Sequence, residues 1–144
     1  MSANPKKKNT KLTIGRLADA AGVSIATVRY YQRRGLMPLP RRPADGGFRE
    51  YGEDDLARLL LIRRAQELGF TLAEVLELVD YVKDRDCDGI VGLADRKLSE
   101  VRAHVAVLEK IRNTLAELIA ECPHGCPDAC PFILKLCARE TGKS

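Results

Sequence analysis

The sequence of 144 residues contains no tryptophan, and aromatic residues make up only 5% of it. This scarcity favours a mainly helical protein over a β-sandwich. No apolar run approaches the roughly eighteen residues of a membrane span. The basic start, MSANPKKKN, is followed by no apolar segment, so it does not resemble a secretory signal. We therefore expect a cytoplasmic protein with no membrane partner, whose residues 1–11 form a disordered basic tail.

The chain also lacks the residue patterns on which catalysis usually depends. It has only two histidines, and neither has an evident catalytic partner. Paired carboxylates, a Ser/His/Asp arrangement and a phosphate-binding loop are missing as well. The sequence therefore predicts a protein that is not an enzyme.

Charge is distributed unevenly along the chain. Residues 1–70 carry 14 Lys and Arg against 7 Asp and Glu, whereas residues 71–144 carry 10 against 13. A basic first half predicts contact with a polyanion such as DNA, and it leaves another task to the second half.

Two short helices are predicted in the basic half, over residues 13–22 and 25–35. Thr13 and Ser24 can cap their starts, and glycines can end both. Two short helices joined by a tight turn are typical of a helix-turn-helix DNA-binding motif. Residues 36–51 contain three prolines, a Gly-Gly pair and several arginines, which predict a basic hairpin wing that contacts phosphates.

The next segments read as two further helices and one long helix. Helices are predicted over 52–69 and 71–82, followed by a polar break over 83–89 and a helix from about 90 to about 120. Apolar residues recur in the long helix at heptad spacing, which favours a coiled coil with a second copy of the chain. These residues are Val91, Ala94, Leu98, Val101, Val105, Leu108, Leu115 and Ile119.

Three cysteines recur at every fourth position after the long helix, at Cys122, Cys126 and Cys130. In a reducing cytoplasm, clustered cysteines are better read as metal ligands or redox groups than as disulfides. Continuing the heptad outward reaches Cys87 at one end and Cys122 at the other, 35 residues apart. An antiparallel dimer would bring Cys87 of one chain to Cys122 of the other, and it would create two identical thiolate sites.

The sequence resembles the MerR family of metal-responsive transcription regulators. The resemblance lies in "LTIGRLADAAGVSIATVRYYQRRGL" and "FREYGEDDLARLLLIRRAQELGFTLAEV", with "LADRKLSEVR" and "CPFI" closest to the mercury-responsive branch. It implies a homodimer that holds RNA polymerase on promoter DNA and activates transcription by distorting the DNA when metal binds. It also implies a winged helix-turn-helix domain over 12–82, a linker and antiparallel dimerisation helix over 83–121, and a metal-binding loop with a short final helix over 122–144.

The resemblance assigns site residues as well. It places the metal ligands at Cys87, Cys122 and Cys130, which in the mercury sensor bind Hg(II) in a trigonal site across the dimer interface. The residues that it implies for DNA contact, with a core position as the alternative for Tyr30 or Tyr31, are Ser24, Thr27, Arg29, Tyr30, Tyr31, Arg33, Arg41, Arg42, Arg49 and Tyr51.

The number of thiolates bears on the charge of the metal: three thiolates suit a divalent soft ion, so Cu(I) is disfavoured. Hg(II) ranks first because the surrounding sequence resembles the mercury sensor most, and Pb(II), Cd(II) and Zn(II) follow as a group. Seven residues separate Cys122 from Cys130, which is shorter than in the mercury sensor. Cys126 or His124 could supply a fourth ligand. Cys137 reads as a packing or spare thiol.

Two rival functions stay open. An iron–sulfur redox sensor of the same family would need the spacing C-x2-C-x-C-x5-C, which this chain does not have. A metal-buffering protein would leave the basic helix-turn-helix without a purpose.

Overall fold

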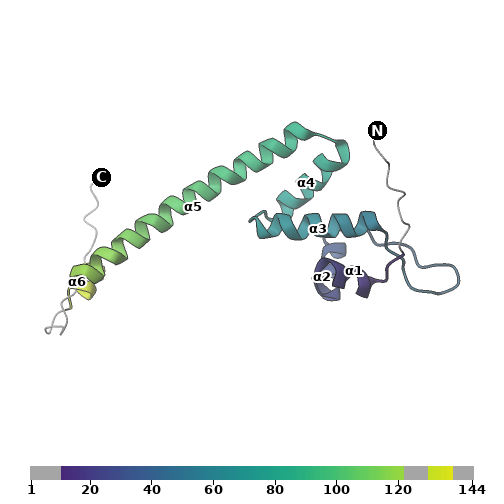
Figure 1. Ribbon diagram of the computed structural model, residues 1–144, viewed down its shortest axis with the longest axis horizontal. Helices are drawn as coiled ribbons and strands as arrows, with labels where there is room; N and C mark the ends of the chain where they lie inside the picture. The colour runs from purple at the N-terminus through teal and green to yellow at the C-terminus, as the bar shows by residue number, and fades with distance from the viewer. Residues whose placement is uncertain (1–10, 122–129, 138–144) are drawn as a thin grey trace, which may run out of the picture. The chain divides into compact units, whose positions relative to one another are not determined.

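The structure of the protein is a computed structural model that describes residues 11–121 and 130–137. The chain divides into two compact units, residues 1–97 and 98–144. All the regular elements in the described ranges are helices, which confirms the mainly helical class (Figure 1). They are α1 (Ile14–Ala21), α2 (Ile25–Arg33), α3 (Glu53–Glu67), α4 (Leu72–Asp84), α5 (Cys87–Glu121) and α6 (Pro131–Cys137).

Helices α1 and α2 form the predicted helix-turn-helix. The Thr13 hydroxyl accepts a hydrogen bond from the Arg16 amide, and the Ser24 hydroxyl does the same for Thr27. Gly22 ends α1 with φ +68°, a left-handed conformation that glycine adopts without strain. The sequence therefore specifies both helices and the sharp turn between them.

The wing segment, residues 36–51, is loop-like as predicted but lacks the paired strands of a hairpin. A turn does form at the expected place, where the Gly46 amide donates to the Pro43 carbonyl at 3.1 Å. No paired strands flank it in the described residues, and the one β-bridge joins Leu12 to Tyr51. Two prolines lie before this turn and a third begins it, and a proline cannot donate to a strand ladder. The segment is therefore an open loop (Figure 1).

The core of the N-terminal unit lies among α1, α2, α3 and α4. Two α3 arginines tie the surrounding backbone to it: Arg63 donates to the Ala21 carbonyl at 2.7 Å, and Arg58 donates to the Leu36 carbonyl at 2.6 Å. The first bond satisfies the carbonyl of the last residue of α1, and the second satisfies a carbonyl of the loop after α2. The fully buried large side chains of this core are Leu17, Val28, Leu36, Leu59, Ile62 and Val75.

The break between α4 and α5 is shorter than predicted. Helix α4 continues to Asp84, and α5 begins at Cys87 instead of near residue 90. Arg85 adopts φ +56° and turns the chain, and the Asp86 carboxylate accepts from the Gly89 amide at 2.9 Å. A carboxylate that caps α5 thus lets the helix start earlier than the apolar pattern indicated.

Replacing two glycines by alanine should change the free energy of unfolding in opposite directions. Gly22→Ala should lower the free energy of unfolding by about 1–2 kcal/mol, because a non-glycine residue pays for the left-handed conformation. Its Cβ would also lie 2.8 Å from the Arg63 guanidinium. Gly92→Ala, in the interior of α5 with open space around it, should raise stability by about 0.5–1 kcal/mol. Urea unfolding at one protein concentration measures both, and equal effects would contradict this reading.

Candidate nucleic-acid interface and metal-ligating cysteines

Helix α2 presents a polar face to solvent. Ser24, Arg29 and Arg33 are exposed, whereas Thr27 and Tyr30 are half-buried. Besides the capping bond, the Ser24 and Thr27 hydroxyls form a hydrogen bond of 2.9 Å, which fixes the orientation of the Thr27 side chain. This face combines donors, acceptors and cations that can contact bases or phosphates.

Arg34 follows directly after α2 and is a further exposed cation beside the expected DNA-contact residues. Its guanidinium carbon lies 5.3 Å from the centre of the Tyr30 ring. The pair places a further positive charge at the end of α2 and holds the Tyr30 ring in position. The adjacent Tyr-Tyr and Arg-Arg pairs of the sequence gave no sign of which arginine stacks on which ring.

Two tyrosines that were expected to face DNA are core residues, which corrects that expectation. Tyr31 is 5% exposed and its hydroxyl donates to the Gln66 side chain. Burial raises the pKa of Tyr31, with a smaller contribution from its neighbour Tyr30. Tyr51 is 2% exposed, and its hydroxyl accepts from the Gln32 amide at 2.8 Å. Both rings pack inward because their amphipathic side chains find apolar neighbours and a polar partner there.

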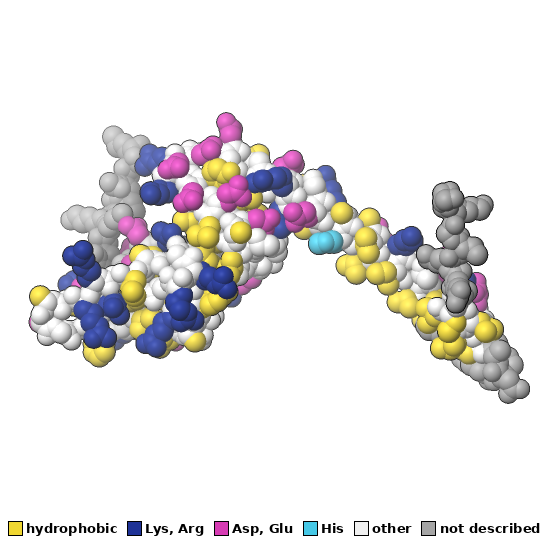
Figure 2. Space-filling view, turned by 180° about the vertical axis from the view of Figure 1, so that it is seen from behind, with side chains coloured by type: hydrophobic (Ala, Val, Ile, Leu, Met, Phe, Trp, Pro, Cys, Tyr) yellow, Lys and Arg dark blue, Asp and Glu magenta, His cyan; other side chains and the backbone are white. Residues whose placement is uncertain are grey.

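The loop after α2 carries exposed cations beside the helix. Arg41 and Arg42 are exposed, and Arg49 is half-buried with its Nε donating to the Pro40 carbonyl at 2.8 Å. A hollow of about 330 Å³ lies between the loop and the helices, lined by Arg29 and Arg42 among others. Figure 2 shows Lys and Arg side chains with few acidic neighbours on the lower part of the N-terminal unit, and Asp and Glu mixed with Lys and Arg on its upper part.

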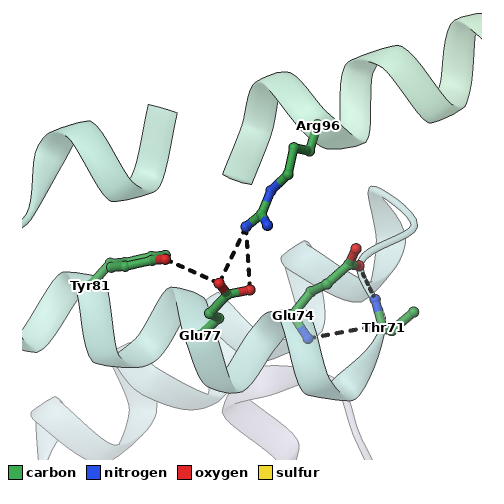
Figure 3. A network of polar contacts seen from close by, with 5 residues as sticks. All are labelled: Thr71, Glu74, Glu77, Tyr81 and Arg96. Carbon is green, nitrogen blue, oxygen red and sulfur yellow. Dashed lines mark hydrogen bonds and ion pairs between the residues drawn. The ribbon is translucent and has the colours of Figure 1, made fainter. Parts of the chain in front are cut away.

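The first turns of α5 are joined to α4 by ion pairs within the N-terminal unit (Figure 3). Glu77 accepts from Arg96 at 3.2 Å and from the Tyr81 hydroxyl at 3.0 Å. The bond to Glu77 raises the pKa of Tyr81. One turn earlier, Glu74 pairs with Lys97 at 2.9 Å. The sequence indicated Glu74 as a capping residue but gave no role to Glu77, Arg96 or Lys97, although Lys97 lies four positions after the buried Leu93, on the same helix face.

The described residues contain three of the five cysteines. Cys87 is the exposed first residue of α5, Cys130 is half-buried directly before α6, and Cys137 is the exposed last residue of α6. Cys122, Cys126 and His124 lie outside the described residues. Within the part that the structure describes, no three His, Cys, Asp or Glu side chains come together as a metal site. The structure thus describes two of the three expected ligands, Cys87 and Cys130, each within its own unit.

The apolar stripe predicted along the long helix is exposed. Val101 is 42% exposed, Val105 47% and Leu108 64%. Side chains of this kind are normally buried, and a continuous row of them is typical of an interface. The other exposed large apolar residues of α5 are Val91, Leu98, Val107, Ile111, Leu115 and Ile119.

Comparison with known proteins identifies the family. The model of the MerR HTH family regulatory protein matches residues 12–82, and that of the MerR DNA-binding region matches residues 56–118. The mercuric resistance operon regulatory protein of Serratia marcescens is 41% identical over 81% of this chain and 81% of its own length. The chain belongs to the MerR family.

Other relatives in the MerR family include a transcriptional regulator of the same type. The regulator ZntR of Escherichia coli (strain K12) is 38% identical over 76% of this chain and 79% of its own. The family therefore makes the chain a helix-turn-helix transcription regulator, in agreement with the fold described above.

Solved structures support this assignment. The regulator PbrR691 from Ralstonia metallidurans CH34, in complex with lead(II), has a TM-score of 0.73 and 31% identity. MerR from Bacillus megaterium MB1, in complex with mercury(II), has a TM-score of 0.68 and 35% identity. Each match covers 87% of this chain and 98% of the other.

None of the described helices has the length and hydrophobicity of a membrane span.

Burial of Tyr51 makes a prediction that separates a core role from a DNA-contact role. Tyr51→Phe removes the bond from Gln32 and should lower the free energy of unfolding by about 1 kcal/mol. Operator affinity should stay within twofold of the unaltered chain, because the ring remains in the core. Urea unfolding and fluorescence anisotropy with labelled operator DNA measure the two effects. A tenfold loss of affinity at unchanged stability would contradict the core assignment.

Proposed function

We propose that the chain is a dimeric, metal-sensing transcription regulator that binds a promoter operator and activates transcription when a thiophilic divalent metal binds. The observation that carries this proposal is helix α5. It runs unbroken from Cys87 to Glu121, directly before Cys122, with an exposed apolar stripe in the same heptad register as both cysteines.

The dimer follows from the length and pattern of that helix. A helix of 35 residues is about 50 Å long, so cysteines at its two ends need a second copy to meet. An antiparallel pair with its two-fold axis between His104 and Val105 places Leu98 against Ile111 and Val101 against Leu108 of the other copy. The same register brings Cys87 to Cys122 of the other copy. Apolar residues are thus paired at these positions, whereas Arg112 interrupts the apolar seam.

The proposed metal site combines Cys87 of one copy with Cys122 and Cys130 of the other. Three thiolates give a site that suits a soft divalent cation. Hg(II) ranks first, in keeping with the mercuric resistance relatives, and Pb(II), Cd(II) and Zn(II) follow. Cys126 or His124 would complete a tetrahedral site for one of the latter three.

The proposed DNA surface consists of the exposed face of α2 and the loop that follows. Hydroxyl and guanidinium groups of α2 would read base edges in the major groove, while the loop arginines would hold phosphates. The residues in this proposal are Ser24, Thr27, Arg29, Tyr30, Arg33, Arg41, Arg42 and Arg49.

Activation would then be a change in DNA shape. Distorting an operator costs a few kcal/mol, and metal binding supplies the stabilisation that favours the distorted complex. RNA polymerase held at the promoter would respond to the changed spacing of the promoter elements. In this scheme residues 12–82 bind DNA, residues 83–121 dimerise and residues 122–144 complete the metal site.

The metal proposal predicts a ranking and a loss. The reduced protein, challenged with Hg(II), Cd(II), Pb(II), Zn(II) and Cu(I) under thiol competition, should retain Hg(II) most strongly. Cys87→Ser should lose that binding at least a hundredfold, because one of three thiolates is gone. Native mass spectrometry of the dimer counts the bound ions. Cys137→Ser is the matched control, and retention of Hg(II) by Cys87→Ser would overturn the ligand set.

The DNA proposal predicts a change in salt dependence. Arg42→Gln removes one phosphate contact per subunit, so the slope of log affinity against log salt should become shallower by about two per dimer. Lys110→Gln, an exposed cation on α5, should leave the slope unchanged. Anisotropy titrations at several salt concentrations measure the slopes. An unchanged slope for Arg42→Gln would remove the loop from the DNA surface.

A further inference from the structure

Lys97 is a cation in an unusual environment. It is 8% exposed and is the buried charged residue of the described part of the chain. Its ammonium group lies 2.9 Å from Glu74 and 5.6 Å from the centre of the Phe70 ring. Burying an ion pair costs desolvation that often cancels its attraction, and apolar replacements can be as stable. Stability is therefore a weak reason for placing this pair here.

The Glu74 carboxylate has a second role on its own helix. Its Oε2 also accepts from the Thr71 amide at 2.7 Å, and the Thr71 hydroxyl accepts from the Glu74 amide (Figure 3). The hydrogen bond from Lys97 is the main reason why the pKa of Glu74 lies below its ordinary value. One oxygen thus serves both the cap of α4 and the cation of α5. The direction of α4 at its start is tied to the position of Lys97.

A second set of contacts fixes the same pair of helices. Glu77 binds Arg96 and the Tyr81 hydroxyl. A Cβ on Gly89 would lie 2.5 Å from the Tyr81 ring, so only glycine allows this approach. Ion pairs and a close ring contact have one good geometry, unlike apolar surfaces that can slide past each other. The register of α4 against the first turns of α5 is therefore set by directional contacts.

The contacts between α4 and the first turns of α5, here called the α4–α5 joint, lie between the proposed metal ligand Cys87 and the DNA-binding core. Cys87, the proposed ligand, begins α5 ten residues before Lys97. Val75 and Val79 of α4 belong to the core of the DNA-binding unit. A shift of α5 caused by metal would reach that core through the residues that join α4 to α5.

We propose that Glu74 and Lys97 are positioning residues that couple metal binding at α5 to the orientation of the DNA-binding helices. The proposal rests on the metal-dependent regulation argued above. It assigns to the pair the transmission of the signal, and neither metal affinity nor operator affinity depends on it.

The test is the double variant Glu74→Gln/Lys97→Met. Gln can still accept from the Thr71 amide, and Met fills the space of the lysine stem without leaving an unpaired charge. Three quantities are measured: Hg(II) affinity under thiol competition, operator affinity without metal, and metal-induced transcription from the operator promoter. The first two should stay within about twofold of the unaltered chain, and the third should fall at least tenfold.

Two further variants separate coupling from general damage. Lys97→Arg keeps the charge, so it should retain most of the metal-induced transcription that the double variant loses. Glu67→Gln removes the exposed ion pair that Arg63 makes within α3, and it should leave all three quantities within twofold.

Each outcome decides the proposal. A metal response of the double variant within twofold of the unaltered chain would overturn it, and so would a parallel loss of operator affinity, which would show a packing role. If the unaltered chain itself gives no metal-induced transcription, the failure belongs to the proposed function and not to this joint.

Discussion

An apolar stripe that one chain cannot bury is the constraint on which the rest of the protein depends. Valine and leucine recur along α5 at heptad spacing, and they remain about half exposed on the isolated helix. Covering them with a second, antiparallel copy would bury the stripe and set the register of the two chains. Because Cys87 and Cys122 belong to the same register, the packing that stabilises the dimer would also decide which thiolates meet.

Helix α5 joins the DNA-binding unit to the stripe through which the chain is proposed to dimerise. Its first turns belong to the compact unit that contains the helix-turn-helix, and ion pairs from α4 fix them there. Its later turns carry the stripe. A rigid helix is well suited to this task, because a displacement at one end is passed along its length with little loss. Because only Arg85 and Asp86 separate α4 from α5, the connection between the two helices is short.

Local signals made much of the fold predictable from sequence. Capping residues such as Thr13, Ser24 and Thr71 act within one turn of their own position, so their helices start where predicted. The heptad pattern predicted one long helix because the spacing of apolar residues along a single helix can be read from the sequence. The start of α5 was missed because a single capping carboxylate, Asp86, outweighed the polar character of the segment.

Tertiary contacts were not predictable in the same way. Tyr31 and Tyr51 find partners 35 and 19 residues away, and nothing near them in the sequence indicates whether their rings point inward. Lys97 carries a charge that usually indicates exposure, yet Glu74 and Phe70 enclose it. The ligand set is different again, because it is an expectation about two chains and involves residues outside the described ranges.

Mixed dimers distinguish a thiolate site shared between two copies from a site within one chain. A chain with Cys87→Ser and a chain with Cys130→Ser, each carrying a different tag, would be co-expressed and the mixed dimer isolated. Only the shared arrangement gives that dimer one complete set of Cys87, Cys122 and Cys130. A shared site predicts one tightly held Hg(II) per mixed dimer and none in either variant homodimer under thiol competition. A mixed dimer that holds no Hg(II), or variant homodimers that hold it as the unaltered protein does, would contradict a site built from both chains.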